Sequence, residues 1–223
     1  MTINAQLIDE AATRLEKVVA KTPLQFSKRL STQYDAKIYI KREDLQEVRS
    51  FKIRGAFNKI ASLSDEEKKR GIVCASAGNH AQGVAWSCSA LKIKGAIFMP
   101  AVSPNQKVQK VKHFGGEYVE VILTGDTFDD AYAASQAYAI EHNAVYVHPF
   151  NDPYTIAGQG TIAKEIYEEL KGAFDMIIAP IGGGGLISGI STYVKEKKPQ
   201  AIVIGAEPAG AAEMYESIKQ NKI

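Results

Sequence analysis

The sequence predicts an α/β protein whose strands form parallel sheets. From residue 72 onward, short runs of β-branched residues alternate with longer stretches of helical spacing, and each pair fills the roughly 30 residues of a βαβ unit. The strands of such units are parallel, because each helix returns the chain to the same end of the sheet. A chain of 223 residues fits either one large domain or two small ones.

The first predicted lobe covers residues 55–148. The charge run at residues 65–70 within it is expected to be a solvated helix end. The expected strands are residues 72–75, 96–99, 117–123 and 145–148, and the expected helices are residues 80–91, 105–114 and 127–142.

A second, larger lobe is predicted from residues 1–54 and 149–223, because the N-terminal elements match none of the repeat in the first lobe. Its sheet has few strands and the sequence stops just after a helix, so we expect this lobe to be incomplete. The expected helices are residues 7–20, 161–170, 186–195 and 211–220, and the expected strands are residues 37–41, 176–180 and 201–206.

Composition excludes several classes of protein. The chain is 45% hydrophobic and 23% charged, which is typical of a globular protein and not of a disordered one. Its 27 Lys and Arg against 25 Asp and Glu give a net charge of +2, so no nucleic-acid partner is expected. No apolar stretch approaches the roughly 20 residues of a membrane span, and no secretory signal begins the chain. We therefore expect a cytoplasmic protein with no membrane partner.

Cysteine and histidine give no metal pattern. Cys74 and Cys88 lack the C-x-x-C spacing of metal or redox sites and are expected to be buried thiols. The four histidines are too scattered for a zinc-binding helix. Histidine-based metal catalysis is therefore not expected.

A buried strand runs into four consecutive glycines, residues 182–185, and then into a helix. Without side chains the backbone can approach an anion closely, and the free N–H groups at the helix start point toward it. The run does not fit the dinucleotide fingerprint G-x-G-x-x-G, because Ile187 or Ser188 stands where the fingerprint requires its third glycine. The run also lacks the Gly-Lys pair of a phosphate-binding P-loop. We predict a phosphate site here; a flexible turn is the alternative.

A similar junction of strand and helix occurs at residues 76–80 (Ser-Ala-Gly-Asn-His). Amides at a helix start suit a carboxylate or a ring oxygen, and Asn79 adds a side-chain donor. Capping and turn residues have the same composition, which is the alternative interpretation. Two anion sites in one α/β chain indicate a ligand with two acidic ends.

Lys52 is the candidate nucleophile. Apolar residues recur at helical spacing after it, so Ser50 is the expected N-cap and Lys52 lies in the first helical turn. The positive helix end favours the neutral amine there, and a neutral lysine can form a Schiff base with a carbonyl. The alternative is a solvated surface lysine.

Five motifs in this order resemble the threonine dehydratase (threonine deaminase) family, and the resemblance covers nearly the whole chain. It implies the second fold type of pyridoxal-phosphate enzymes, which is like the tryptophan synthase β subunit: two α/β lobes with the cofactor in the cleft between them. The motifs are residues 41–46 (KREDLQ), 50–52 (SFK), 76–82 (SAGNHAQ), 156–161 (IAGQGT) and 182–186 (GGGGL).

Carried over position by position, the resemblance implies a residue for each part of the cofactor, pyridoxal 5'-phosphate. Lys52 would hold it as a Schiff base, Phe51 would lie against its ring, and Asn79 would bind the 3-oxygen. The phosphate would be bound by the backbone of Gly182, Gly183, Gly184, Gly185 and Leu186.

The resemblance also implies a substrate pocket. Ala77 stands where serine racemases have a serine that handles the proton on the opposite face, which favours elimination over racemisation. Phe150 stands where the racemases have a polar amide and would give an apolar wall for the methyl group of threonine. The substrate carboxylate would be received by Ser76, Gly78, Asn79 and His80.

A cation site is implied by alignment with the metal loop of the racemases. Its ligands would be Glu207, Glu213 and the carbonyl of Ala211. The alternative is that Glu207 is an acid ending a strand and Glu213 a solvated acid on a helix.

The implied reaction is β-elimination of L-threonine to 2-oxobutanoate and ammonia, with L-serine giving pyruvate as a secondary activity. Residues 41–50 are closer to the biosynthetic form, which serves isoleucine synthesis, than to the degradative form. The resemblance further implies a homo-oligomer, either a dimer or a tetramer.

Three alternatives remain open from the sequence. One is a serine racemase or serine dehydratase of the same superfamily. Another is a nicotinamide-dependent oxidoreductase, since Glu207 ends a strand about 20 residues after Gly185, as expected of a ribose-binding acid. The third is an inactive fragment, because family chains continue past residue 223 to a segment that meets the pyridine nitrogen.

Overall fold

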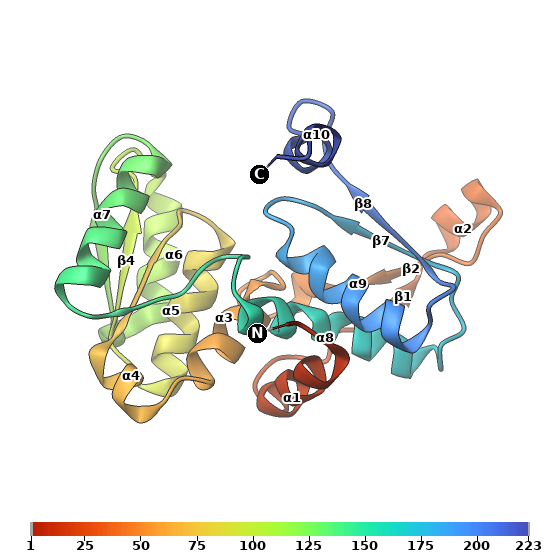
Figure 1. Ribbon diagram of the computed structural model, residues 1–223, viewed down its shortest axis with the longest axis horizontal. Coiled ribbons are helices and arrows are strands. Elements are labelled where there is room, and N and C mark those ends of the chain that lie inside the picture. Colours follow the sequence, from red (N-terminus) through yellow and green to blue (C-terminus); the bar gives the residue numbers. More distant parts are fainter. Residues whose placement is uncertain (1, 223) are drawn as a thin grey trace.

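A computed structural model describes residues 2–222 and contains two groups of helices and strands that lie side by side (Figure 1). One group holds a four-stranded sheet in the order β5-β4-β3-β6, and all of its strands are parallel. This confirms the predicted parallel sheet. Its strands are β3 (Ile72–Ala75), β4 (Gly95–Met99), β5 (Val119–Leu123) and β6 (Val145–Tyr146).

Helices cover both faces of this sheet. Ile72 and Cys74 on β3 pack in one hydrophobic cluster with side chains of α5 (Asn79–Leu91) and α6 (Asn105–Gly115). The alternate residues, Val73 and Ala75, pack in another with α7 (Phe128–Glu141). All four residues of β3 are buried, which is typical of a parallel strand between two layers of helix. Cys74 and Cys88 are buried free thiols, as predicted.

The second group is built around β7 (Met176–Pro180) and β8 (Ile202–Ala206), which are parallel and joined by α9 (Gly185–Lys197). Its hydrophobic cluster unites α1 (Ala5–Leu15), α8 (Pro153–Glu169) and α9. The other face of this sheet is open, and the Ile178 side chain on it is 65% exposed. Within residues 2–222, no helix has the length and apolarity to cross a membrane.

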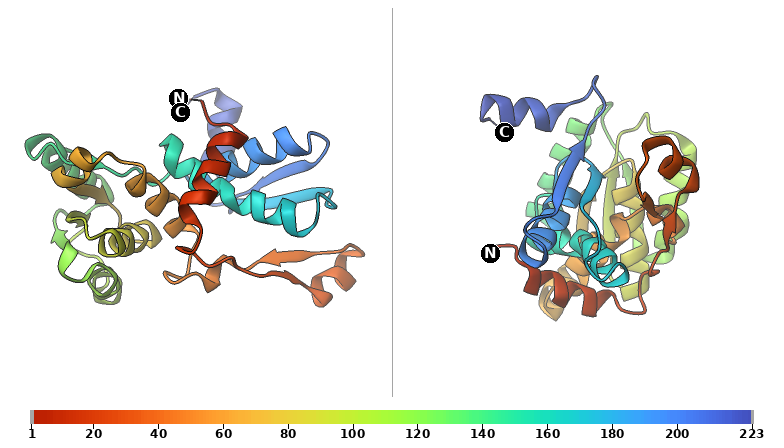
Figure 2. Two further views of the ribbon diagram at one scale, coloured as in Figure 1. Left: turned by 90° about the horizontal axis from the view of Figure 1, so that it is seen from below. Right: turned by 90° about the vertical axis from the view of Figure 1, so that its right-hand side faces the viewer.

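Short elements complete the chain. The antiparallel pair β1 (Leu24–Phe26) and β2 (Tyr39–Lys41), with α2 (Lys28–Tyr34) between them, forms the red and orange edge of the molecule in Figure 2. At the other end, α10 (Glu213–Gln220) lies beyond β7 and β8 (Figure 1). The remaining elements are α3 (Lys52–Ala61), α4 (Asp65–Arg70) and the 3-10 turns η1 (Glu43–Leu45) and η2 (Gly116–Tyr118).

Several predicted boundaries are wrong. The helix expected at residues 7–20 ends at Leu15, and Lys17 adopts a left-handed φ of 62°. The predicted strand 145–148 ends at Tyr146, so His148 lies in the following loop. The helix expected from residue 161 begins at Pro153, where the Asp152 side chain accepts a hydrogen bond from Thr155 N–H (2.9 Å).

Two predicted helix ends are also corrected. Ser50 is not the N-cap of α3; Phe51 holds that position without a capping side chain, and the buried Ser50 hydroxyl has no partner within the described residues. The charge run at residues 65–70 is a separate helix rather than a helix end. Ser64 and Glu67 form a capping box that begins it, which satisfies backbone N–H groups at its start.

The early glycines of α8 explain why its first turns were missed. Glycine disfavours helix interiors, so residues 158 and 160 are unfavourable to a helix in isolation. In the fold Gly158 allows α3 and α8 to touch, because a Cβ atom on Gly158 would lie 2.6 Å from Arg54 O and 2.7 Å from Gly55 Cα. Gly55 N–H also donates to Gln159 Oε1 (3.2 Å). Close packing of backbones therefore overrides local propensity here.

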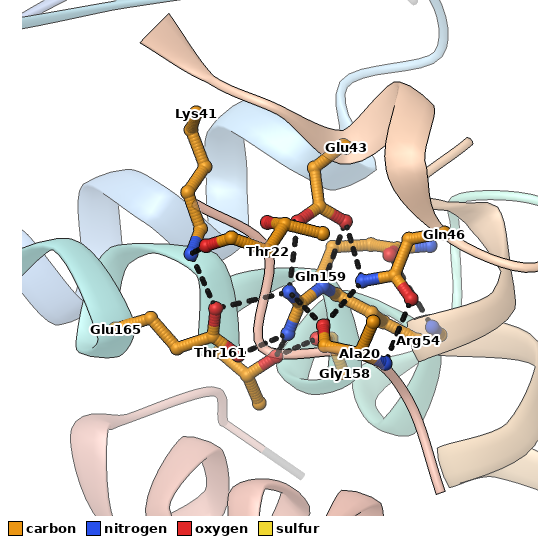
Figure 3. A network of polar contacts seen from close by, with 11 residues as sticks. Ala20, Thr22, Lys41, Glu43, Gln46, Arg54, Gly158, Gln159, Thr161 and Glu165 are labelled. Atoms are coloured by element: carbon orange, nitrogen blue, oxygen red, sulfur yellow. Dashed lines mark hydrogen bonds and ion pairs between the residues drawn. The ribbon is translucent and has the colours of Figure 1, made fainter. Parts of the chain in front are cut away.

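A buried network of charges fixes the same two helices (Figure 3). Arg54 on α3 is fully buried and donates to Glu43 through Nε and Nη2 (2.8 Å each), and to Glu165 on α8 through Nη1 (2.6 Å). Its Nη1 also donates to Thr161 Oγ1 (3.1 Å), and Lys41 donates to Glu165. Two cations thus face two carboxylates, so the network as a whole carries no net charge.

Neutral partners extend the network to the N-terminal segment. Glu43 accepts a hydrogen bond from Thr22 Oγ1 (2.6 Å). Gln46 Nε2 donates to the Ala20 carbonyl oxygen (2.8 Å), and Gln46 Oε1 accepts from Ala20 N–H (3.0 Å). Burial raises the pKa of the Glu43 carboxyl, but the hydrogen bonds and charge of Arg54 lower it more, so its pKa lies below the usual value. Glu43 therefore stays ionised at neutral pH, and the network ties residues 20–46 to α3 and α8.

Replacing Arg54 by methionine should destabilise the fold by about 3–5 kcal/mol, because two largely buried carboxylates would lose their main partner. Urea unfolding followed by circular dichroism measures this change. The matched control is Arg42→Met, which removes an exposed ion pair with Asp44 and should leave the unfolding midpoint unchanged. Equal midpoints for the two variants would contradict the structural role of Arg54.

Candidate functional site

Lys52 is the first residue of α3 and is partly buried between the two groups of elements. Its Nζ donates a hydrogen bond to the carbonyl oxygen of Pro149 (2.8 Å) and lies 5.5 Å from the centre of the Phe51 ring. Burial lowers the pKa of the Lys52 amine from 10.5 to about 8. A substantial fraction of this amine is therefore neutral near physiological pH, as a nucleophile requires.

Phe150 connects Lys52 to the glycine run. It follows Pro149 directly, and its ring packs against Gly183 so closely that no Cβ atom would fit there. Its Cα would lie 2.9 Å from a Cβ atom on Gly185. The amine and residues 182–185 therefore contact the same short turn, although about 130 residues separate them in the sequence.

The glycine run itself is open to a ligand. A Cβ atom on Gly182 would meet nothing within 4 Å, and Gly184 has a left-handed φ of 82°, which favours glycine. α9 begins at Gly185, and within the described chain the N–H groups of residues 182–187 donate to no protein acceptor. These donors and the positive end of α9 suit an anion.

The second junction, between β3 and α5, has a similar opening. Ser76 Oγ accepts from Gly78 N–H (3.2 Å), and a Cβ atom on Gly78 would meet nothing within 4 Å. Asn79 is exposed as the first residue of α5, and Ala77 is partly buried beside the same turn. The predicted carboxylate-binding residues therefore lie together at the start of one helix.

His80 differs from its neighbours because its ring faces inward. It is buried, and its Nε2 lies 2.9 Å from the Val147 carbonyl oxygen. Burial and the nearby charge of Lys52 lower the pKa of His80 to about 3, so the ring is neutral. The backbone N–H of His80, in the first turn of α5, has no partner within the helix and is available to a ligand at the helix start.

The structure gives Glu207 a capping role. Its Oε1 accepts from Met214 N–H (3.0 Å) and its Oε2 from Tyr215 N–H (2.9 Å), so both oxygens stabilise the start of α10. Glu213 is exposed, and Ala211 N–H donates to Pro208 O (2.9 Å). In residues 2–222, no three His, Cys, Asp or Glu side chains gather in a way that could hold a metal ion.

Two residues near the site were not identified from the sequence. The Pro149 carbonyl contacts the candidate nucleophile, and the His148 ring organises the turn that carries Phe150. Their position depends on how α8 meets α3, and the sequence around them carries no motif that indicates it.

Comparison with known proteins agrees with this geometry. Residues 15–223 match the family model described as pyridoxal-phosphate dependent enzyme. The chain is 55% identical over 223 residues to the biosynthetic L-threonine dehydratase of Staphylococcus aureus, covering 99% of this chain and 53% of the relative. It is 56% identical over 209 residues to the corresponding protein of Halalkalibacterium halodurans, covering 94% and 50%. The chain spans about half the length of the curated relatives it matches.

Solved structures give the same result. The processed form of threonine deaminase isoform 2 from Solanum lycopersicum superposes with a TM-score of 0.91 at 40% identity, covering 98% of this chain and 63% of that one. Maize serine racemase superposes with a TM-score of 0.94 at 36% identity, covering 100% and 67%. The fold, the turn that contacts both Lys52 and the glycine run, and these matches agree, and the chain belongs to the family of pyridoxal-phosphate dependent enzymes.

Proposed function

We propose that this chain carries the lysine and the phosphate-binding loop of an enzyme that eliminates the hydroxyl group of L-threonine, giving 2-oxobutanoate and ammonia. The observation that carries the proposal is the partly buried Lys52 amine, whose pKa is lowered to about 8. This amine contacts the same turn, at Pro149 and Phe150, as the glycine run at residues 182–185. The relatives named as biosynthetic L-threonine dehydratases support this substrate and a place in isoleucine synthesis.

The residues present fit pyridoxal 5'-phosphate. Open space at Gly182 and the free N–H groups of residues 182–187 suit its phosphate, and the neutral fraction of Lys52 suits its aldehyde. Asn79 at the start of α5 supplies a donor for the ring oxygen. When bound, this cofactor delocalises the electrons that remain after the Cα proton leaves.

Different residues of the chain would have different roles in the reaction. Lys52 Nζ would hold the cofactor, and the free amine of the same residue would accept the Cα proton as a base. The Pro149 carbonyl orients that nitrogen from one side. The backbone around residues 76–80 receives the substrate carboxylate, and Phe51 lies 5.5 Å from Nζ, where it shields the site from water.

Threonine is favoured over serine by the apolar ring of Phe150, which would contact the extra methyl group. Such a contact contributes about 1–3 kcal/mol, so serine stays a slower substrate that gives pyruvate. Ala77 offers no hydroxyl group to return a proton on the opposite face, which favours elimination over the racemase alternative. Membership of this family speaks against the nicotinamide-dependent alternative.

We also propose the lobe division at residues 54 and 148. Two hydrophobic clusters contain only residues between 56 and 147, and the third contains residues 3–51 and 154–203. The site then lies where the two lobes meet. The cytoplasmic location and the homo-oligomer implied by the resemblance remain predictions.

Lys52→Ala in the intact protein should abolish ammonia release from threonine, because the Lys52 amine bonds the turn that packs on the glycine run and is the proposed base. Ammonia release is measured with Lys107→Ala, an exposed lysine on α6, as the matched control with full activity. Unchanged turnover in Lys52→Ala would refute the assignment.

Capture of added pyridoxal 5'-phosphate should accelerate as the pH rises through about 8. Burial disfavours the charged ammonium form of Lys52, so the neutral fraction grows on passing this pKa and not near 10.5. Visible absorbance that borohydride removes reports the capture. A midpoint near 10 would show that the amine is solvated, and a colourless protein would favour the inactive-fragment alternative.

Phe150→Asn should lower the ratio of kcat/KM for threonine over serine about tenfold, because the methyl group loses its apolar contact. Phe128→Asn, an exposed phenylalanine on α7, is the matched control and should leave the ratio unchanged. Both ratios come from coupled assays of the two oxo-acid products. A ratio that does not move in Phe150→Asn would exclude this ring as the specificity wall.

A further inference from the structure

The turn at residues 147–151 contacts both Lys52 and the glycine run of the candidate site. The Val147 carbonyl bonds the His80 ring, the Pro149 carbonyl accepts from Lys52, and Phe150 packs on the glycine run. This turn lies between β6 and α8 and belongs to no helix or strand. Its shape therefore depends on hydrogen bonds made within it and just after it.

The His148 ring supplies those bonds. Its Nδ1 accepts from Phe150 N–H (3.2 Å) and from Asn151 N–H (2.8 Å), and its ring meets the Phe150 ring edge to face at 4.6 Å between centres. Its backbone carbonyl accepts from Thr155 Oγ1 (3.2 Å), which fixes the turn to the first turn of α8. A single imidazole thus closes the turn around Pro149 and Phe150.

Burial, rather than the charges around it, keeps the His148 ring neutral at pH 7. Burial lowers the pKa of His148, Asp152 at the N-cap of α8 raises it, and Lys52 on α3 lowers it again, so that the pKa lies below the usual value. His80 on α5 and Tyr146 on β6 also face the ring. In the neutral ring the proton must reside on Nε2, because Nδ1 accepts two hydrogen bonds.

We propose that His148 is a positioning residue: its imidazole holds the turn at residues 147–151 and thereby sets where the Lys52 amine and the Phe150 ring lie relative to residues 182–185. The inference deepens the proposed function and rests on it for its role in catalysis. On this proposal the protonation state of the Lys52 amine depends on His148, a residue that need not touch the cofactor or the substrate.

Asparagine is the variant that separates this role from simple packing. An Asn side chain places Oδ1 at the position from Cβ that Nδ1 has in histidine, and Asn commonly accepts from N–H groups two and three residues ahead. His148→Asn should therefore keep the turn, although it is smaller than histidine. His148→Leu keeps the bulk but removes the acceptor, and His148→Gln places its acceptor one carbon farther out.

The test measures the Lys52 amine without any cofactor. Competitive acetylation with acetic anhydride across pH 6–11, read by peptide mass spectrometry, gives a pKa and a reactivity for each lysine of the intact protein. The wild-type midpoint for Lys52 should lie near 8. His148→Leu should raise it by about one unit, which lowers the neutral fraction at pH 7 about tenfold, and His148→Asn should restore the wild-type midpoint.

Two results would overturn the proposal: a wild-type midpoint in folded His148→Leu, or a His148→Asn midpoint displaced as far as that of His148→Leu. Lys107 is the internal control and should titrate alike in all proteins. If His148→Leu does not fold, His148→Gln takes its place, and a wild-type midpoint in that variant would be equally damaging. Failure of the wild-type protein to take up pyridoxal 5'-phosphate would refute the proposed function alone, since acetylation uses no cofactor.

Discussion

The network of ion pairs around Arg54, whose charges cancel, is the constraint on which the site depends. It joins α3 to α8 through Glu165 and to the N-terminal segment through Glu43; Arg54 is fully buried and both carboxylates are largely buried. Desolvating so many charges is costly, and an apolar cluster of equal volume often stabilises a fold as well. Directional bonds, however, permit only one register of α3 against α8, and register is what the site requires.

That register determines the distance between two helix starts. Lys52 begins α3, and the turn that carries Pro149 leads into α8. Contact between Gly55 and Gly158 brings the two backbones together, while Arg54 fixes how far one slides along the other. A slip of one helical turn, about 5.4 Å, would separate the amine from the Pro149 carbonyl. Gly158 in the interior of α8 therefore helps to set the geometry of the site, although it lies outside the site.

The sequence predicts the local elements well and the long-range contacts poorly. Strand β3 is predicted with its bounds correct, because four β-branched or small residues are bounded by Gly71 and Ser76. The start of α8 is missed because glycine propensity is judged without its packing partner. Ser50 is taken as a cap because its chemistry suits one, yet its hydroxyl is buried. Lys52, residues 76–80 and the glycine run lie within recognisable sequence motifs, whereas the turn at His148 lies within none.

The reason for a neutral Lys52 also differs from the one that the sequence indicates. A helix start disfavours a partly buried cation by at most about 2 kcal/mol. The fall of the Lys52 pKa from 10.5 to about 8 corresponds to about 3 kcal/mol, and burial causes it. The walls of the site, Phe51 and the turn with Pro149 and Phe150, therefore do more than shape the pocket. They remove water from the amine, so that packing rather than a neighbouring charge makes it a nucleophile.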